Sequence, residues 1–512
     1  MNLCDAVGRL FLIGLPGKCV DSQTERLLKT VKPGFIILFA RNINGPEQVR
    51  ELVNEINKIL PYKPVFAIDQ EGGIVSRFKQ GFTVSPGAMA LSATGKPDNA
   101  RKAAEILGKE MRAVGIHWDL APVVDINANL ANPGIGIRSF GDNPKTVTEF
   151  AAAFADGLHR HGILVCLKHF PGLGRVDVDP HLDLPVLDID LKGLLKFELI
   201  PFQHIPSESI MPSHIYLPRL QRKCEPCSLA KEVLTDLARH RLGFQGVLVS
   251  DDFLMKGVTN YFSVEEAANK AFCSGMVVLS ISDQPDVQIA TKAAVIKCIK
   301  RSPILQRRLC ESLERIEQIR KRAFSAPTYP IDIVGDIEHL KEMERIADLS
   351  ITARLCDLEI LPLDFNLISR IYTVKLTCIT SVEDTTEAQI PWVAKVIREK
   401  SQAPLISFES HISVKEAFKL ASTVPEKGLV IMFTENAHLY EGQKRLVKEI
   451  AKRANKFLLI ALRNPYDCFI PGVQNWITTY GYELISQRSL LKVLEGIIKP
   501  TGRLPVREIS IL

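Results

Sequence analysis

The segment GFIILFARNINGPEQVRELVNEINKILPYKPVFAID (residues 34–69) contains one full unit of the pattern that decides the fold. Two continuous apolar runs, GFIILF and PVFAID, flank a charged segment in which apolar residues return every three to four positions. A continuous apolar run indicates a strand that is buried on both faces, and the intervening spacing indicates an amphipathic helix. The unit therefore predicts two parallel strands that are connected by a helix.

Apolar runs of this kind, each followed by a helix-like stretch, recur through the first 285 residues. They are LFLIGL (10–15), GFIILF (34–39), PVFAID (64–69), HWDLAPVVDI (117–126), GILVCLKHF (162–170), SIMPSHI (209–215), GVLVSDD (246–252) and MVVLSIS (276–282). Eight strand–helix units predict an α/β fold of the TIM-type (β/α)8 barrel class. A doubly wound open sheet usually ends at about five or six strands, and no GxGxxG motif follows the first run.

A second domain is expected after the barrel, because 512 residues exceed one ordinary core. Helical sequence continues to about residue 323 and is followed by the Pro- and Gly-containing stretch FSAPTYPIDIVGD. We assign residues 1–325 to the barrel, 326–345 to a linker and 346–512 to a smaller α/β domain. In this domain a helix over 341–355 precedes strand-like runs near 371–380, 428–433 and 457–462.

Composition excludes several classes of protein. With 46% apolar and 24% charged residues the chain is not disordered, and a net charge of +6 is too small to indicate a nucleic-acid partner. No stretch reaches the roughly 18 apolar residues of a membrane span. The N-terminal sequence MNLCDAVGRLFLIGLPGKCV lacks the basic opening and small-residue cleavage site of a signal peptide, so we expect a cytoplasmic protein.

The eleven cysteines are scattered, and several stand in apolar runs, so we expect buried free thiols in a reducing compartment. The pair Cys224 and Cys227 has the spacing of a metal-ligand pair, but neither a second pair nor two suitably spaced histidines follow. His159 and His161 have no third ligand nearby and are expected in a turn. We therefore expect no metal and no cofactor.

In a barrel, catalytic groups stand at the carboxyl ends of the strands. Asp251 ends the run GVLVSD, and an ionised carboxylate there needs donors, which Lys168, His169, Arg77 and Arg138 are placed to supply. Such a carboxylate can attack an electrophilic carbon. The ordinary alternative is that Asp251 or Asp252 caps the next helix.

His181 lies in the loop after the fifth run, two residues beyond Asp179. Alternation along an extended loop puts both side chains on one side, where a carboxylate orients the imidazole for acid–base work. An exposed loop histidine with an incidental acidic neighbour is the alternative. Lys168, inside an apolar strand, has a reading of its own: with a lowered pKa it could form a Schiff base, as barrel aldolases do. Asp69 could accept two sugar hydroxyls.

Several motifs together resemble a known family. KHFPGLGRVDVDPHLDLP, AIDQEGGIVSRF, IRSFGDNP and GVLVSDDFLMKG are similar to the bacterial β-N-acetylglucosaminidases of glycoside hydrolase family 3. The likeness covers residues 5–325 in order, and the tail resembles the C-terminal α/β sandwich domain of longer members. The resemblance implies a metal-free, retaining exo-glycosidase that removes terminal, non-reducing β-linked N-acetylglucosamine (GlcNAc).

The resemblance also implies roles for individual residues. Asp251 matches the nucleophile, His181 the general acid–base and Asp179 its dyad partner. The residues that match sugar-binding positions are Asp69, Arg77, Arg138, Lys168 and His169. Together with the missing export signal, the resemblance implies muropeptide fragments such as GlcNAc-anhydroMurNAc as substrate. The protein is expected to be a monomer or homodimer with no nucleic-acid or membrane partner.

Other activities stay open. A neutral histidine base does not repel phosphate, so phosphorolysis is an alternative to hydrolysis, as is β-glucosidase activity, although that branch draws its acid–base carboxylate from the second domain. Outside this class stand an aldolase built on Lys168 and a catalytically silent sugar-binding module. Two departures from the family pattern, Leu173-Gly174-Arg175-Val176 for His-Gly-Asp-Thr and Pro180 for Ser, put the preference for the leaving group in question.

Overall fold

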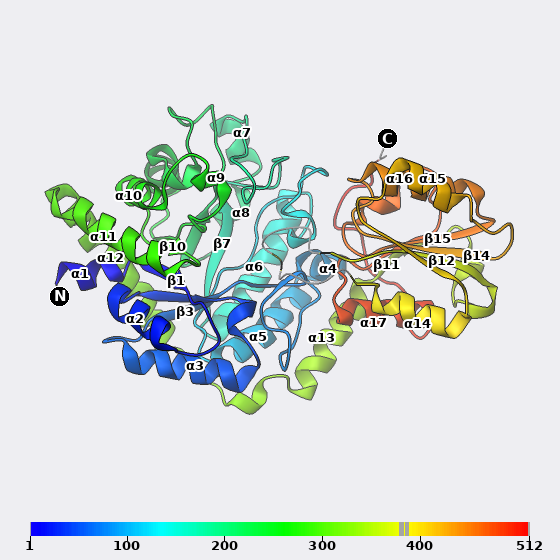
Figure 1. Ribbon diagram of the computed structural model, residues 1–512, viewed down its shortest axis with the longest axis horizontal. Coiled ribbons are helices and arrows are strands. Elements are labelled where there is room, and N and C mark those ends of the chain that lie inside the picture. Colours follow the sequence, from blue (N-terminus) through cyan, green and yellow to red (C-terminus); the bar gives the residue numbers. More distant parts are fainter. Residues whose placement is uncertain (1, 378–382, 384–388, 510–512) are drawn as a thin grey trace.

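The computed structural model describes residues 2–377, 383 and 389–509 of the chain. Two α/β domains lie side by side, with the N-terminal domain on the left of Figure 1 and the C-terminal domain on the right. In the part of the chain that is described, no helix is both long and apolar enough to cross a bilayer.

The sheet of the N-terminal domain consists of eight strands in the order β10-β1-β2-β3-β6-β7-β8-β9, and every neighbouring pair is parallel. The strands are β1 (Phe11–Gly14), β2 (Phe35–Leu38), β3 (Val65–Ile68), β6 (Trp118–Asp119), β7 (Leu164–Phe170), β8 (Ser209–Pro212), β9 (Val247–Leu248) and β10 (Leu279–Ile281). A parallel bridge between Val249 and Val278 joins the last strand to β10 and closes the sheet. The predicted barrel is confirmed, and each strand lies within one of the eight predicted runs.

Amphipathic helices cover the outside of this barrel (Figure 1). They include α2 (Ser22–Val31), α3 (Pro46–Ile59), α5 (Pro97–Ala113), α6 (Pro144–Arg160), α10 (Val264–Ser274), α11 (Pro285–Lys300), α12 (Pro303–Ser325) and a π-helix (Glu232–Arg241). In α3 the buried positions are Pro46, Val49, Leu52, Val53 and Ile56, which is the spacing of one helix face. Burial of each such side chain contributes about 1.5–3 kcal/mol and holds the helix against the sheet.

The C-terminal domain contains a six-stranded sheet in the order β11-β16-β15-β14-β12-β13, parallel except where β11 meets β16. The strands are β11 (Thr352–Arg354), β12 (Ile368–Val374), β13 (Leu405–Phe408), β14 (Leu429–Thr434), β15 (Lys456–Ala461) and β16 (Trp476–Thr478). The helices α15 (Val414–Ala421) and α16 (Glu441–Arg453) cover one face, and α14 (Trp392–Ser401) and α17 (Leu484–Leu494) cover the other (Figure 1). This is the expected α/β sandwich.

Three of these strands, β12, β14 and β15, correspond to the predicted runs near 371–380, 428–433 and 457–462, although residues 378–380 lie outside the described residues. The helix expected over 341–355 is α13 (Ile337–Ser350), and β11 follows it. Before α13, the Arg112 guanidinium of α5 donates hydrogen bonds to the carbonyls of Ala323, Ala326 and Pro327. The connection between the domains is thus fixed on the barrel surface, and the boundary that we place after residue 345 falls inside α13.

Candidate active site

A cavity of about 590 Å³ opens at the carboxyl ends of the barrel strands. Its lining includes all eight candidate residues: Asp69, Arg77, Arg138, Lys168, His169, Asp179, His181 and Asp251. Residues that sequence reasoning did not assign also line it, among them Phe39, Arg41, Met211, Met255, Ser282 and Glu383. The barrel therefore brings the predicted residues together, as expected for groups that follow parallel strands.

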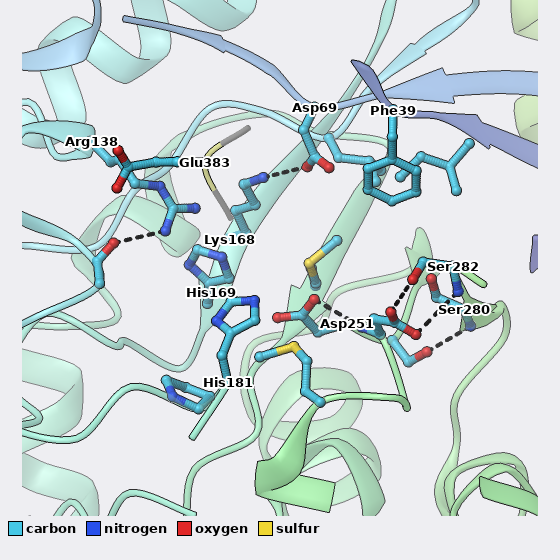
Figure 2. A pocket seen from close by; sticks show the side chains of 18 of the residues that line it. Phe39, Asp69, Arg138, Lys168, His169, His181, Asp251, Ser280, Ser282 and Glu383 are labelled. Carbon is cyan, nitrogen blue, oxygen red and sulfur yellow. Dashed lines mark hydrogen bonds and ion pairs between the residues drawn. The ribbon is translucent and has the colours of Figure 1, made fainter. Parts of the chain in front are cut away.

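A buried network of ionised side chains lies at one wall of the cavity. The ammonium of Lys168 lies 2.7 Å from Oδ1 of Asp69 (Figure 2). It also lies 2.7 Å from Oε1 of Glu71. Arg138 donates from Nε and Nη2 to both oxygens of Glu71, at 2.9 and 2.8 Å. Burial alone would lower the pKa of Lys168, but the charges of Asp69 and Glu71 raise it above its usual value. The expectation that Lys168 has the lowered pKa of a Schiff-base lysine is therefore wrong.

Asp69 reaches from this network toward Arg77, whose Nη2 lies 3.9 Å from Oδ2. The guanidinium of Arg77 also lies over the ring of Phe39, 5.7 Å from its centroid. Because Lys168 occupies one oxygen of Asp69, the other is the one placed to accept a hydroxyl from a ligand. Phe39 adds an apolar wall beside these polar groups.

His169 is oriented by a carboxylate of its own. Its Nδ1 lies 2.7 Å from Oδ2 of Asp125, and its backbone N–H donates to the same oxygen at 3.1 Å. Since a carboxylate only accepts, the proton is on Nδ1 and Nε2 remains for a ligand. The other oxygen of Asp125 accepts from the backbone N–H of Leu173 and so fixes the start of the following loop. Asp125 stands next to the end of the fourth predicted run, HWDLAPVVDI (117–126), and this position is the sequence signal for it.

The predicted hydrogen bond between His181 and Asp179 is present, with Nδ1 and Oδ1 2.7 Å apart. The backbone N–H of His181 donates to the same oxygen at 2.9 Å. Burial disfavours the imidazolium, but the hydrogen bond to Asp179 and the charges of Asp179 and Asp251 outweigh it and raise the pKa of His181. In turn, the pKa of Asp179 is lowered, because the bond to His181 outweighs burial.

Asp251 is a half-buried carboxylate that faces the cavity (Figure 2). Burial would raise its pKa, but the charges of His214, His169 and His181 lower it below the usual value. Its Oδ1 accepts the backbone N–H of Asp252 at 2.9 Å. The group is therefore held in its ionised form.

The expected donors to Asp251 require a correction. Lys168 bonds to Asp69 and Glu71, Arg138 bonds to Glu71, and His169 bonds to Asp125. These long-range pairings could not be read from the order of residues in the chain. Of the expected groups, His169 still acts on Asp251 through its charge, together with His214 and His181.

Asp252 has a different task from its neighbour. Its Oδ1 accepts the backbone N–H groups of Leu254 and Ser282, each at 3.2 Å, and the Ser282 hydroxyl bonds to Oδ2. Burial raises the pKa of Asp252 to about 6. Its side chain therefore fixes the loop, and the helix cap expected of Asp251 or Asp252 is wrong, because the next helix, α9 (Lys256–Thr259), begins after Met255 without a side-chain cap. His214 supports the same loop by donating from Nε2 to the Asp252 carbonyl, 3.1 Å away.

Glu383 enters the cavity wall from the C-terminal domain. Its carboxylate is held by Arg463, with Nη2 2.7 Å from Oε1 and Nη1 3.0 Å from Oε2. The Tyr482 hydroxyl donates to Oε2 at 2.8 Å. No local pattern around SVEDTTE points to the cavity, so the sequence held no signal for this residue.

The positions that depart from the family pattern lie in the loop of the dyad. Leu173 and Pro180 line the cavity. Arg175 turns away from it, with Nε 2.7 Å from Oε1 of Glu198 and its guanidinium 4.2 Å from the centroid of the Phe197 ring. The departures therefore add an apolar contact at the cavity and an ionic anchor on its outside.

The residues considered as metal ligands are the pairs His159 and His161, and Cys224 and Cys227. His159 bonds to Glu208 at 2.9 Å and His161 to the hydroxyl of Tyr329 at 2.7 Å. Cys224 is exposed, whereas Cys227 is buried. Within the described residues, no group of three or more His, Cys, Asp or Glu side chains is placed to hold a metal ion.

The chain is similar in sequence and structure to known proteins. The model of the glycosyl hydrolase family 3 N terminal domain matches residues 5–319. Beta-hexosaminidase A of Pseudoalteromonas piscicida is 28% identical over 94% of this chain and 90% of its own length. The beta-hexosaminidase of Haemophilus influenzae is 35% identical over 53% of this chain and 79% of its own. A glycoside hydrolase family 3 beta-N-acetylglucosaminidase from Paenibacillus sp. has a similar structure, with a TM-score of 0.89 at 27% identity and 100% of both chains covered.

Proposed function

This chain belongs to glycosyl hydrolase family 3 and is a β-N-acetylhexosaminidase, and we propose that it removes terminal β-linked GlcNAc by double displacement at Asp251. One observation carries the assignment of roles. The His181–Asp179 pair and the ionised Asp251 line one cavity at the carboxyl ends of the barrel strands. A nucleophile and a proton donor at one glycosidic bond are what retaining hydrolysis needs.

In the first step, the Asp251 carboxylate attacks the anomeric carbon of the sugar while the bond from this carbon to the leaving oxygen breaks. The proton on Nε2 of His181 passes to that oxygen, and a glycosyl ester of Asp251 forms. The lowered pKa of Asp251 and the raised pKa of His181 favour the ionised nucleophile and the protonated acid together. Asp179 keeps Nδ1 occupied, so Nε2 is the nitrogen that faces the substrate.

In the second step, His181 is neutral and removes a proton from water as the water oxygen attacks the anomeric carbon. The ester bond breaks, Asp251 returns to a carboxylate, and His181 is again protonated. Two inversions at one carbon give net retention of configuration.

The terminal sugar is held by the opposite wall. Asp69 offers a carboxylate oxygen, His169 offers Nε2, and Arg77 extends beside them. Lys168 and Arg138 are already bonded to carboxylates, so they orient Asp69 and Glu71 and keep this wall rigid. Sugar hydroxyls bind to such preorganised groups with little loss of conformational freedom.

The competing activities differ in which group does the chemistry. Glu383 is a carboxylate from the second domain, as the β-glucosidase reading would require, but Arg463 and Tyr482 donate to both of its oxygens. A carboxylate that accepts three hydrogen bonds from cationic and hydroxyl donors is a poor proton donor. The aldolase reading is disfavoured by the raised pKa of Lys168.

We further infer that the enzyme works in the cytoplasm on muropeptide fragments such as GlcNAc-anhydroMurNAc. Each cysteine that the structure describes is a free thiol, and Cys166, Cys227 and Cys468 are buried. Unpaired thiols suit a reducing compartment.

The proposed function is tested by assaying p-nitrophenyl β-GlcNAc and p-nitrophenyl β-glucoside side by side, with and without phosphate. We expect rapid release from the GlcNAc substrate alone and free GlcNAc as product. Release of sugar 1-phosphate would replace hydrolysis with phosphorolysis. No release from the GlcNAc substrate would contradict the proposal.

A further inference from the structure

A segment of the barrel, residues 127–138, lies between the C-terminal domain and the loop that carries the dyad. We name it the bridging loop, and we name residues 171–183 the acid–base loop. The bridging loop ends at Arg138, which donates back to the carbonyl of Gly134 at 2.9 Å. The C-terminal domain contacts the bridging loop on one side, and the acid–base loop contacts it on the other.

On one side, polar groups of the C-terminal domain bind the bridging loop. The side-chain amide of Asn127 donates to the Tyr466 hydroxyl at 2.9 Å, and both residues are 2% exposed. Nε2 of His438 lies 3.3 Å from the carbonyl of Leu130, to which it donates, since a carbonyl only accepts. Asp467 orients this histidine from Nδ1 at 2.7 Å.

Close packing reinforces these bonds. A Cβ atom on Gly136 would stand 2.7 Å from Oδ1 of Asn464, so the two segments touch where a side chain has no room. The φ angle of Gly136 is +45°, which glycine adopts at least cost. Ile137 belongs to a buried cluster that also contains Tyr466 and Tyr480 of the C-terminal domain.

On its other side, the bridging loop binds the acid–base loop. The side-chain amide of Asn132 donates to the carbonyls of Leu173 and Val176 at 2.7 and 3.0 Å. The amide of Asn129 donates to the carbonyls of Arg175 and Val176, each at 3.1 Å. These four bonds grip the backbone just before the dyad.

The dyad itself rests on the same surface. Gly134 lies against the Asp179 carboxylate, since a Cβ there would be 3.7 Å from its Cγ. Next to the dyad, Val178 is 37% and Leu182 61% exposed, although Leu173 and Val176 earlier in the loop are buried. On the far side, the backbone N–H of Gly257 holds the Pro180 carbonyl at 2.9 Å. The stretch around His181, which follows the buried Leu173 and Val176, is thus positioned in part by these neighbours.

We propose that Tyr466 and His438 of the C-terminal domain are positioning residues for His181, acting through the bridging loop. This inference rests on the proposed function, in which His181 transfers the proton. A proton donor must stand within hydrogen-bond reach of the leaving oxygen, and a misplacement of about 1 Å can cost 10²-fold in rate. The C-terminal domain is therefore part of the acid–base apparatus, although none of these residues touches the substrate.

The test compares leaving groups. Tyr466→Phe removes the hydroxyl that Asn127 binds, and Tyr466→Phe combined with His438→Leu removes both polar anchors. We expect kcat/KM for the disaccharide GlcNAc-β-1,4-GlcNAc, whose leaving alcohol needs a proton, to fall by about tenfold in the double variant. For 2,4-dinitrophenyl β-GlcNAc, whose phenolate leaves unaided, kcat/KM should stay within about twofold. With this substrate kcat and KM should fall together, because only the second step needs the histidine.

Two further variants make the test specific. Asn127→Ala breaks the same bond from the barrel side, so its effect should not add to that of Tyr466→Phe. Tyr372→Phe is the matched control, because this buried hydroxyl bonds to Thr423 at 2.9 Å within the C-terminal domain and should leave both substrates unaffected.

Equal losses with both substrates, or no loss with the disaccharide, would overturn the positioning role while the wild type stays active. A wild type that cleaves neither substrate would instead contradict the proposed function, and the positioning role would fall with it. A leaving-group-dependent loss in Tyr372→Phe would also overturn the inference.

Discussion

Nδ1 of His181 and Oδ1 of Asp179 lie 2.7 Å apart, two residues from each other in the chain and in the same loop. The bond fixes which imidazole nitrogen carries a proton toward the cavity and raises the pKa of the ring against the effect of burial. Most retaining glycosidases use a carboxylic acid whose pKa must be raised. A histidine with a pKa near ~6.5 in water begins closer to the working range.

Replacement of Asp251 should abolish the first step. We expect Asp251→Asn to lower kcat by about 10⁴-fold or more, because an amide does not attack the anomeric carbon. The matched control is Asp252→Asn, which keeps an acceptor for Leu254 and Ser282 and should retain most activity. If the two variants exchange these behaviours, the nucleophile is the other aspartate.

The pH profile should report the dyad. Since the pKa of His181 is raised, its acid form persists above pH ~6.5 and is lost as pH rises through that raised value. We expect Asp179→Asn to move the alkaline limb of kcat/KM to lower pH, because the carboxylate that raises the pKa is gone. The measurement is kcat/KM for GlcNAc-β-1,4-GlcNAc across about pH 5–9 at constant ionic strength. An unmoved alkaline limb would separate Asp179 from the titration.

Glu383 and His181 can be compared directly as proton donors. His181→Ala should lower kcat/KM for the disaccharide by about 10²–10⁴-fold and leave kcat/KM for 2,4-dinitrophenyl β-GlcNAc nearly unaffected. Glu383→Gln should change kcat/KM for the disaccharide by less than about tenfold, since Arg463 can still bond to Glu435. The alkaline limb of its pH profile should remain. Loss of the alkaline limb in Glu383→Gln alone would transfer the acid–base role to the second domain.

Lys168 should matter for stability as much as for sugar binding. Lys168→Met leaves Asp69 and Glu71 buried with fewer counter-charges, and we expect the free energy of unfolding in urea to fall by about 3 kcal/mol. Lys145→Met, on an exposed lysine 3.9 Å from Glu149, should change it by less than about 1 kcal/mol. Equal effects of the two substitutions would show that the buried network is energetically unimportant.

The barrel could be predicted because each strand is a continuous apolar run, so that even the two-residue strands β6 and β9 stand inside longer signals. The His181–Asp179 bond was equally local. By contrast, Lys168 bonds to Asp69, which is 99 residues away and follows another strand. The expectation that Lys168 donates to Asp251 is therefore wrong. Glu383 comes from another domain, and its neighbours Arg463 and Tyr482 stand 80 and 99 residues further on.

The covalent role of Asp251 can be measured most directly by trapping. The enzyme is incubated with a 5-fluoro-GlcNAc fluoride, digested with pepsin, and mapped by mass spectrometry. We expect one glycosyl adduct, on Asp251 in the peptide that contains GVLVSDDF, and its absence in Asp251→Asn. An adduct on Lys168, Asp252 or Glu383, or steady turnover with no adduct on any residue, would contradict the mechanism.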